Sequence, residues 1–140
     1  MQFVVREKPI FVKVGASRTY YDVALAVKAG ADVVVVDGMQ GGTGATQDVF
    51  IEHVGIPTLP ALRQAVAALK ELDQHRQVQL IISGGIRSGA AAAKALAMGA
   101  DAVSIGQGVL VALGCNRDHY VDQSGQKMNV TEDYERLGTA

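Results

Sequence analysis

Hydrophobic residues recur along most of this chain in two alternating patterns. Short apolar runs predict β-strands over residues 10–16, 31–38, 78–85 and 101–108. Apolar residues at helical spacing predict helices over residues 19–28, 59–73 and 88–98. The four valines at 33–36 are typical of a strand buried on both faces in a parallel sheet, and residues 10–16 also indicate a buried strand.

The strand-helix pattern repeats along the chain. Residues 28–33 and 97–102 share the pattern Gly-Ala-Asp, and each copy ends a helix at a glycine and begins an apolar strand. Four βα units imply parallel strands with right-handed crossovers. A doubly wound open sheet would be complete in 140 residues, whereas a (β/α)8 barrel needs about 250. The glycine turns described below favour the barrel, so the predicted fold is the C-terminal half of a (β/α)8 TIM barrel.

Composition narrows the class of partner. The net charge is −1 and the pI is near 6.3, which argues against nucleic acid or an anionic membrane. No leader pattern and no apolar run of about 20 residues is present, so we expect a cytoplasmic protein. One cysteine excludes an internal disulfide, and the three histidines share no metal-ligand spacing, so no metal site is expected.

The polar C-terminal tail predicts a domain boundary. Residues 1–115 would form the partial barrel, and residues 116–140 a polar, irregular extension with little more than a helical turn near 131–137. An open half-barrel exposes unpaired strand edges, which indicates a fragment or a subunit that needs a partner.

Two glycine turns follow the last two predicted strands. Ser83, Gly84 and Gly85 end one strand, and Gly106 and Gln107 end the next. In barrels such turns often bind phosphate through backbone N–H groups, aided by the N-terminus of a short helix. The alternative is that each glycine only makes a tight turn.

Polar side chains at the same strand ends are candidate ligand contacts. Lys13 interrupts an apolar strand and could donate to a cofactor carbonyl or a substrate carboxylate, or it could face water on an edge strand. Asp37 precedes a glycine-rich loop and could approach a flat ligand or cap its own turn. Arg18 could bind a carboxylate or begin a solvated helix, while Gln40 and Thr43 are further polar contacts.

Four segments together resemble a known family. VKVGAS, AGADVVVVDGMQGGTGAT, LIISGGIRSG and GADAVSIGQGVLVALGC are similar to the C-terminal half of the flavin-binding synthase domain of glutamate synthase, over residues 10–115. The DG..GGTGA loop is the most specific piece. The other glycine motifs are also similar to inosine-monophosphate dehydrogenase and to other barrels that hold FMN or nucleotide phosphate.

The resemblance implies an FMN-dependent oxidoreductase acting on CH–NH2 donors. Reduced flavin would deliver a hydride to 2-iminoglutarate, formed from 2-oxoglutarate and ammonia, giving L-glutamate. By position, Lys13 would be the catalytic residue beside flavin and substrate. The other cofactor contacts would be Gly41, Gly42, Thr43, Ser83, Gly84, Gly85, Gly106 and Gln107, and the substrate contacts Arg18, Gln40 and Gly44. The implied partners are an N-terminal half-barrel, a glutaminase domain and an electron-donor protein.

The sequence also departs from the family pattern. Met39 and Gln40 stand where the family usually has His-Asp, and Cys115 matches only the first of three cysteines that bind an iron–sulfur cluster. We therefore expect no cluster from this chain alone. These departures leave open a relative acting on N-methylglutamate, or a non-catalytic half-barrel. An inosine-monophosphate-dehydrogenase-like enzyme is disfavoured, because Cys115 follows the last phosphate turn rather than lying in a loop between the flanking strands.

Overall fold

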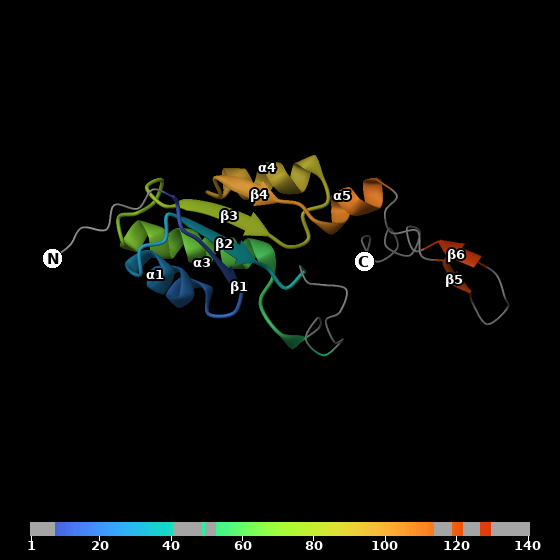
Figure 1. The fold of residues 1–140 in the computed structure, drawn as a ribbon, viewed down its shortest axis with the longest axis horizontal. Helices are drawn as coiled ribbons and strands as arrows, with labels where there is room; N and C mark the ends of the chain where they lie inside the picture. The colour runs from blue at the N-terminus through green and yellow to red at the C-terminus, as the bar shows by residue number, and fades with distance from the viewer. Residues whose placement is uncertain (1–7, 41–48, 50–52, 114–118, 122–126, 130–140) are drawn as a thin grey trace. The chain divides into compact units, whose positions relative to one another are not determined.

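A four-stranded parallel sheet forms the centre of the chain (Figure 1). The computed structural model describes residues 8–40, 49, 53–113, 119–121 and 127–129. The strands are β1 (Phe11–Gly15), β2 (Val33–Asp37), β3 (Gln79–Ser83) and β4 (Ala102–Ser104). Helices α1 (Thr19–Lys28), α3 (Thr58–Glu71) and α4 (Gly89–Ala97) connect or follow them. Each of these elements lies within or very near its predicted range.

The strand order shows which parallel architecture the chain adopts. Neighbouring strands follow the sequence, β1-β2-β3-β4, and every pair is parallel. Right-handed crossovers in one direction place all connecting helices on the same face. Helix α1 packs on β1 and β2, and α3 packs on β2 and β3, behind the strands in Figure 1. This singly wound order is that of a (β/α)8 barrel wall, because a doubly wound sheet reverses direction and has helices on both faces.

Alternate residues of each strand build the core against the helices. Val34, Val36, Leu80 and Ile82 are fully buried on this face. They meet the apolar stripe of α3, in which Leu62 and Leu69 are also fully enclosed. The predicted stripe of α3 is therefore confirmed as the side that covers the sheet.

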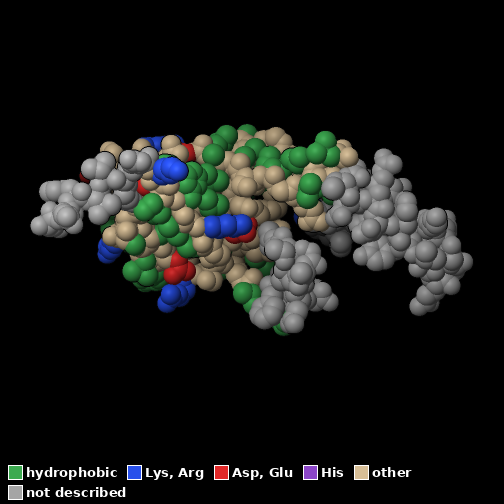
Figure 2. Space-filling model, viewed as in Figure 1, with side chains coloured by type: hydrophobic (Ala, Val, Ile, Leu, Met, Phe, Trp, Pro, Cys, Tyr) green, Lys and Arg blue, Asp and Glu red, His purple; other side chains and the backbone are tan. Residues whose placement is uncertain are grey.

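The opposite face of the sheet is only partly covered. Phe11 on β1 is 58% exposed, and no residue of that strand is fully buried. The prediction of a buried strand over residues 10–16 was thus wrong, because β1 is an edge strand with a neighbour on one side only. Figure 2 shows hydrophobic side chains exposed on this side of the molecule, with basic and acidic side chains adjoining among them.

The repeated helix-to-strand segments have the same structure in both copies. Asp32 accepts a hydrogen bond from the amide of Ile10 (2.7 Å), and its own amide donates to the Ile10 carbonyl. Asp101 makes the same two bonds with Leu80, its carboxylate accepting from the amide at 2.8 Å. In each copy the aspartate joins the start of its strand to the preceding strand, which explains why both copies keep it.

The remaining described residues belong to a second compact unit that begins at Gly106. It contains α5 (Gln107–Ala112) and an antiparallel hairpin of β5 (His119–Val121) and β6 (Lys127–Asn129). Helix α5 was not predicted from the sequence, and the prediction of an irregular tail was wrong over the hairpin, where residues pair across strands. The turn predicted near 131–137 lies outside the described residues. Across the described part of the chain, no helix has the length and apolar character needed to span a membrane.

Candidate functional site

The last residues of the strands form one row at the carboxyl edge of the sheet. Gly15 lies opposite Asp37, Asp37 opposite Ser83, and Ser83 opposite Ser104. Register neighbours in a parallel sheet point to the same face, here the face away from the helices. In barrels and open α/β sheets alike, ligands bind at the carboxyl ends of the strands. Ser104 was not among the predicted site residues, because only the register places it in this row.

Lys13 and Asp37 form an ion pair on this face. The Lys13 Nζ lies 2.8 Å from Asp37 Oδ2, and the side chains are 60% and 23% exposed. Both alternatives for Asp37, a ligand contact or a cap of its own turn, missed this pairing. Lys13 does lie on an edge strand, yet its ammonium group has a carboxylate partner.

The turn after β3 has a backbone that only glycine adopts easily. Gly84 has φ +103° and Gly85 has φ +70°. A Cβ on Gly84 would lie 2.8 Å from the carbonyl oxygen of Gly38, in the turn that follows β2. The alternative that these glycines make a tight turn is therefore correct for Gly84, although it does not exclude a ligand at the outer side of the turn.

A buried threonine joins this turn to the neighbouring segments. The Thr58 hydroxyl lies 2.7 Å from the Gly84 carbonyl oxygen and 2.8 Å from Gln40 Oε1, and it can donate its one proton to either. The Thr58 amide also donates to Gln40 Oε1 (2.9 Å). Gln40 thus satisfies a free N–H group in the first turn of α3. Its amide oxygen serves the fold, and a substrate contact of Gln40 stays a prediction.

Backbone hydrogen bonds hold the surrounding segments together. The Gly38 amide donates to the Ser83 carbonyl (2.9 Å), and the Ile56 amide donates to the Ala16 carbonyl (2.7 Å). The Met39 amide in turn donates to the Ile56 carbonyl at 3.0 Å. Met39 and Ile56 lie on either side of the glycine-rich loop, so both ends of that loop are fixed at the carboxyl edge.

Unused backbone donors lie beside the β3 turn. Within the described residues, the amides of Gly85 and Ile86 donate no hydrogen bond. Helix α4 begins directly afterwards, where the Ser88 hydroxyl caps the Ala91 amide (3.2 Å). The free N–H groups and the positive end of the helix dipole together favour an anion.

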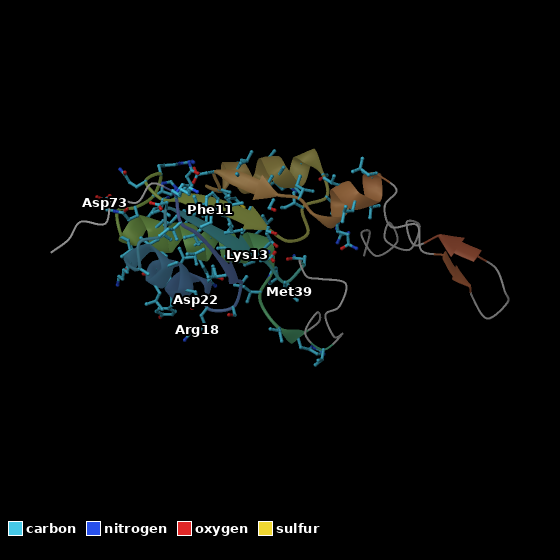
Figure 3. All side chains as sticks on the ribbon, in the orientation of Figure 1. Phe11, Lys13, Arg18, Asp22, Met39 and Asp73 are labelled. Carbon is cyan, nitrogen blue, oxygen red and sulfur yellow. The ribbon has the colours of Figure 1, made fainter. Side chains whose placement is uncertain are left out.

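Arg18 does not lie beside Lys13 and Asp37. Its side chain is 74% exposed, and its guanidinium contacts Asp22 Oδ1 at 3.3 Å, four residues along α1. Figure 3 shows Arg18 and Asp22 together on the α1 side, apart from Lys13. The structure therefore gives Arg18 the solvated position at a helix start, and its role toward substrate stays a prediction.

Several predicted site residues cannot be placed in this edge. Gly41, Gly42, Thr43, Gly44 and Cys115 lie outside the described residues. Gly106 and Gln107 begin α5 in the second unit, so their pairing with the β3 turn stays a prediction. Within the described ranges, no group of His, Cys, Asp and Glu residues could hold a metal ion.

Comparison with solved structures defines the class of fold. A mandelate oxidase variant solved with a monooxide FMN adduct is 31% identical, with a TM-score of 0.58 over 79% of this chain and 31% of that one. A flavocytochrome b2 variant with benzoylformate is 24% identical, with a TM-score of 0.61 over 79% of this chain and 26% of that one. The prediction of a partial (β/α)8 barrel is confirmed by these flavoenzyme barrels and by the strand order.

Comparison with known sequences then defines the family. The family model described as the conserved region in glutamate synthase matches residues 1–123, and the chain belongs to this family. A glutamate synthase large subunit-like protein from Rhizobium meliloti is 65% identical over 133 residues, covering 95% of this chain and 28% of that protein. The archaeal glutamate synthase [NADPH] of Methanocaldococcus jannaschii is 46% identical over 110 residues, covering 78% of this chain and 22% of that protein. The chain thus spans about a quarter of the length of these relatives.

Proposed function

We propose that this chain supplies the C-terminal half-barrel of an FMN-dependent oxidoreductase of glutamate synthase type. The full-length protein would reductively aminate 2-oxoglutarate to L-glutamate. Residues 1–115 would belong to the barrel and residues 116–140 to an extension. The observation that carries the proposal is the Lys13–Asp37 pair, which stands in the same edge as the Ser83–Gly85 turn in a chain of this family.

The residues at this edge fit a phosphate-bearing flavin. The amides of Gly85 and Ile86, beside the start of α4, would donate to phosphate or ribityl oxygens. The mandelate oxidase neighbour was solved with an FMN adduct, which supports this cofactor class. When bound, FMN supplies hydride transfer, which no side chain can perform by itself.

Lys13 would act on the substrate. An ammonium group at the mouth of the site can donate to a carboxylate or to the carbonyl oxygen of an oxo acid, and such charge-assisted hydrogen bonds are stronger than neutral ones. It would orient the substrate and stabilise negative charge near the reacting carbon. Asp37 offsets part of the positive charge when no substrate is present.

The partly uncovered face of the sheet is evidence that another half-barrel packs on it in the full-length protein. Phe11 is well exposed on edge strand β1, and the relatives are about three and a half times as long as this chain. We infer that the preceding part of the full-length protein covers this face and completes the barrel. An amine source and an electron-donor protein would be its further partners.

Flavin retention and product formation test the proposal. The full-length protein should copurify with FMN and, once reduced, should convert 2-oxoglutarate and ammonia to L-glutamate detectable by mass spectrometry. Lys13→Ala should reduce product formation strongly, whereas Lys28→Ala, an exposed lysine at the end of α1, should not. A protein that binds no FMN, or a Lys13→Ala variant with unchanged activity, would contradict the assignment.

The same assay can test which amine the full-length protein uses. Replacing ammonia by methylamine tests whether N-methylglutamate is formed instead. Faster turnover with methylamine would move the proposal to the N-methylglutamate branch while leaving the flavin site intact.

A further inference from the structure

The Lys13–Asp37 contact runs diagonally across the sheet. Lys13 is the middle residue of β1 and lies opposite Val35, whereas Asp37 is the last residue of β2 and lies opposite Gly15. The lysine therefore starts one layer below the carboxyl edge. Its ammonium group reaches the edge because it extends toward Asp37, where Nζ and Oδ2 are 2.8 Å apart.

At the carboxyl edge, strand β1 itself provides no side chain that could contact the Lys13 ammonium group. Gly15, the next residue on the same face, has no side chain, and a Cβ placed there would meet nothing within 4 Å. The lysine side chain is also more than twice as exposed as that of Asp37. A long side chain that is mostly exposed samples many rotamers, so the carboxylate of Asp37 is the group that selects one for Lys13.

Asp37 depends on the lysine in return. Its second oxygen, Oδ1, is buried and has no hydrogen-bond partner among the described residues. A half-buried carboxylate with one unsatisfied oxygen gains most of its compensation from the charge of Lys13. The two side chains thus form a single unit rather than an incidental surface pair.

We propose that Asp37 is a positioning residue that holds the Lys13 ammonium group at the carboxyl edge, ready for an anionic substrate. This rests on the proposed function, in which Lys13 contacts the oxo acid. Asp37 acts through Lys13 and has no direct contact with substrate. Its removal therefore weakens substrate binding only as long as Lys13 is present.

A double-mutant cycle in the full-length holoenzyme tests this dependence. The dissociation constant of 2-oxoglutarate is measured from the perturbation of the flavin absorption spectrum, without turnover. Both Lys13→Ala and Asp37→Asn should raise it about tenfold, the value of one charged hydrogen bond. In the Lys13→Ala background, Asp37→Asn should add nothing further.

Two variants keep the test interpretable. Asp37→Glu retains the charge one methylene further out, so its dissociation constant for 2-oxoglutarate should lie between those of wild type and Asp37→Asn. If the Asp37→Asn protein is insoluble, Asp37→Glu takes its place in the cycle. Asp73→Asn removes an exposed carboxylate at a positive-φ position that Asn also tolerates, and it should leave binding unchanged.

The outcomes separate the two proposals. Additive effects of the single variants, or an Asp37→Asn protein that binds like the wild type while Lys13→Ala binds weakly, overturn the positioning role alone. Loss of FMN from the wild type, or a silent Lys13→Ala, overturns the proposed function and the positioning role together.

Discussion

The hydroxyl of Thr58 lies 2.7 Å from the carbonyl oxygen of Gly84, although the two residues are 26 positions apart. Thr58 begins α3, and Gly84 follows β3. Gln40, which follows β2, accepts a hydrogen bond from the amide of the same threonine, and its Oε1 also lies 2.8 Å from the hydroxyl. One buried residue thereby joins the start of a helix to the segments that follow two strands.

Removing the Thr58 hydroxyl should destabilise the fold. Thr58 is buried, so Thr58→Val leaves the Gly84 carbonyl oxygen without its donor, at a cost of about 1–3 kcal/mol, while the backbone amide of residue 58 still donates to Gln40. Thr58→Ser keeps the hydroxyl and should lose less. Chemical denaturation of the full-length protein measures the difference, and equal stability of the two variants would show that the hydroxyl is unimportant.

Replacing glycine at position 84 should destabilise the fold, whereas replacing glycine at position 89 should not. Gly84→Ala places a Cβ 2.8 Å from the Gly38 carbonyl oxygen at φ +103°, so we expect a loss of about 1–3 kcal/mol. A Cβ on Gly89, the first residue of α4, meets nothing within 4 Å, and alanine favours helix by about 0.5–1 kcal/mol. Thermal unfolding should rank Gly89→Ala at or above wild type and Gly84→Ala below it; the reverse order would contradict this backbone.

The paired aspartates of the repeated segments should contribute to stability. Asp101→Ala leaves the buried-strand amide of Leu80 without its acceptor and also removes the ion pair with Arg76. We expect a loss of about 1–3 kcal/mol, most of it from the unsatisfied amide. Arg76→Ala removes only the exposed partner and should cost at most about 1 kcal/mol. Comparable losses in both variants, measured by denaturant unfolding, would assign the effect to the ion pair instead.

Tyr20 should make stability depend on pH in the alkaline range. Its phenol donates a hydrogen bond to Glu71, and this bond, followed by desolvation and the Glu71 charge, raises the pKa of Tyr20 above 10.0. A raised pKa in the folded state means that the contribution of the neutral phenol is complete below the unfolded pKa. It is lost as the pH rises through the folded pKa.

The ultraviolet absorbance of tyrosinate measures this titration. The difference between wild type and Tyr20→Phe should titrate above the ordinary tyrosine pKa, and Glu71→Gln should lower that pKa. The advantage of wild type over Tyr20→Phe in melting temperature should also shrink at high pH. A Tyr20 that titrates like a free tyrosine in the folded protein would show that the Glu71 bond is absent in solution.

Local patterns were enough to predict the secondary structure of the first unit. Helix α1 has the predicted bounds, and the apolar stripe of α3 faces the sheet, because periodicity reports which side of an element is buried. The repeated aspartates at positions 32 and 101 also marked equivalent places in the fold. The DG..GGTGA loop and the glycine turns indicated a family that the comparisons confirm.

Other features depend on contacts between segments far apart in the chain. Whether β1 is central or at an edge depends on its neighbours, so an apolar run could not reveal that Phe11 is exposed. The hairpin of β5 and β6 arises from pairing within a polar segment that has little apolar patterning.

The sequence by itself determined the βα repeat, the family and the positions of the candidate site residues, because these depend on residue type and local spacing. Only the tertiary structure decided which of these side chains contact one another. Strand register places Asp37 diagonally above Lys13, and the packing of α3 on the sheet brings Thr58 to Gln40. Each of these contacts joins side chains whose distance is set by strand register and helix packing, which single-residue patterns do not contain.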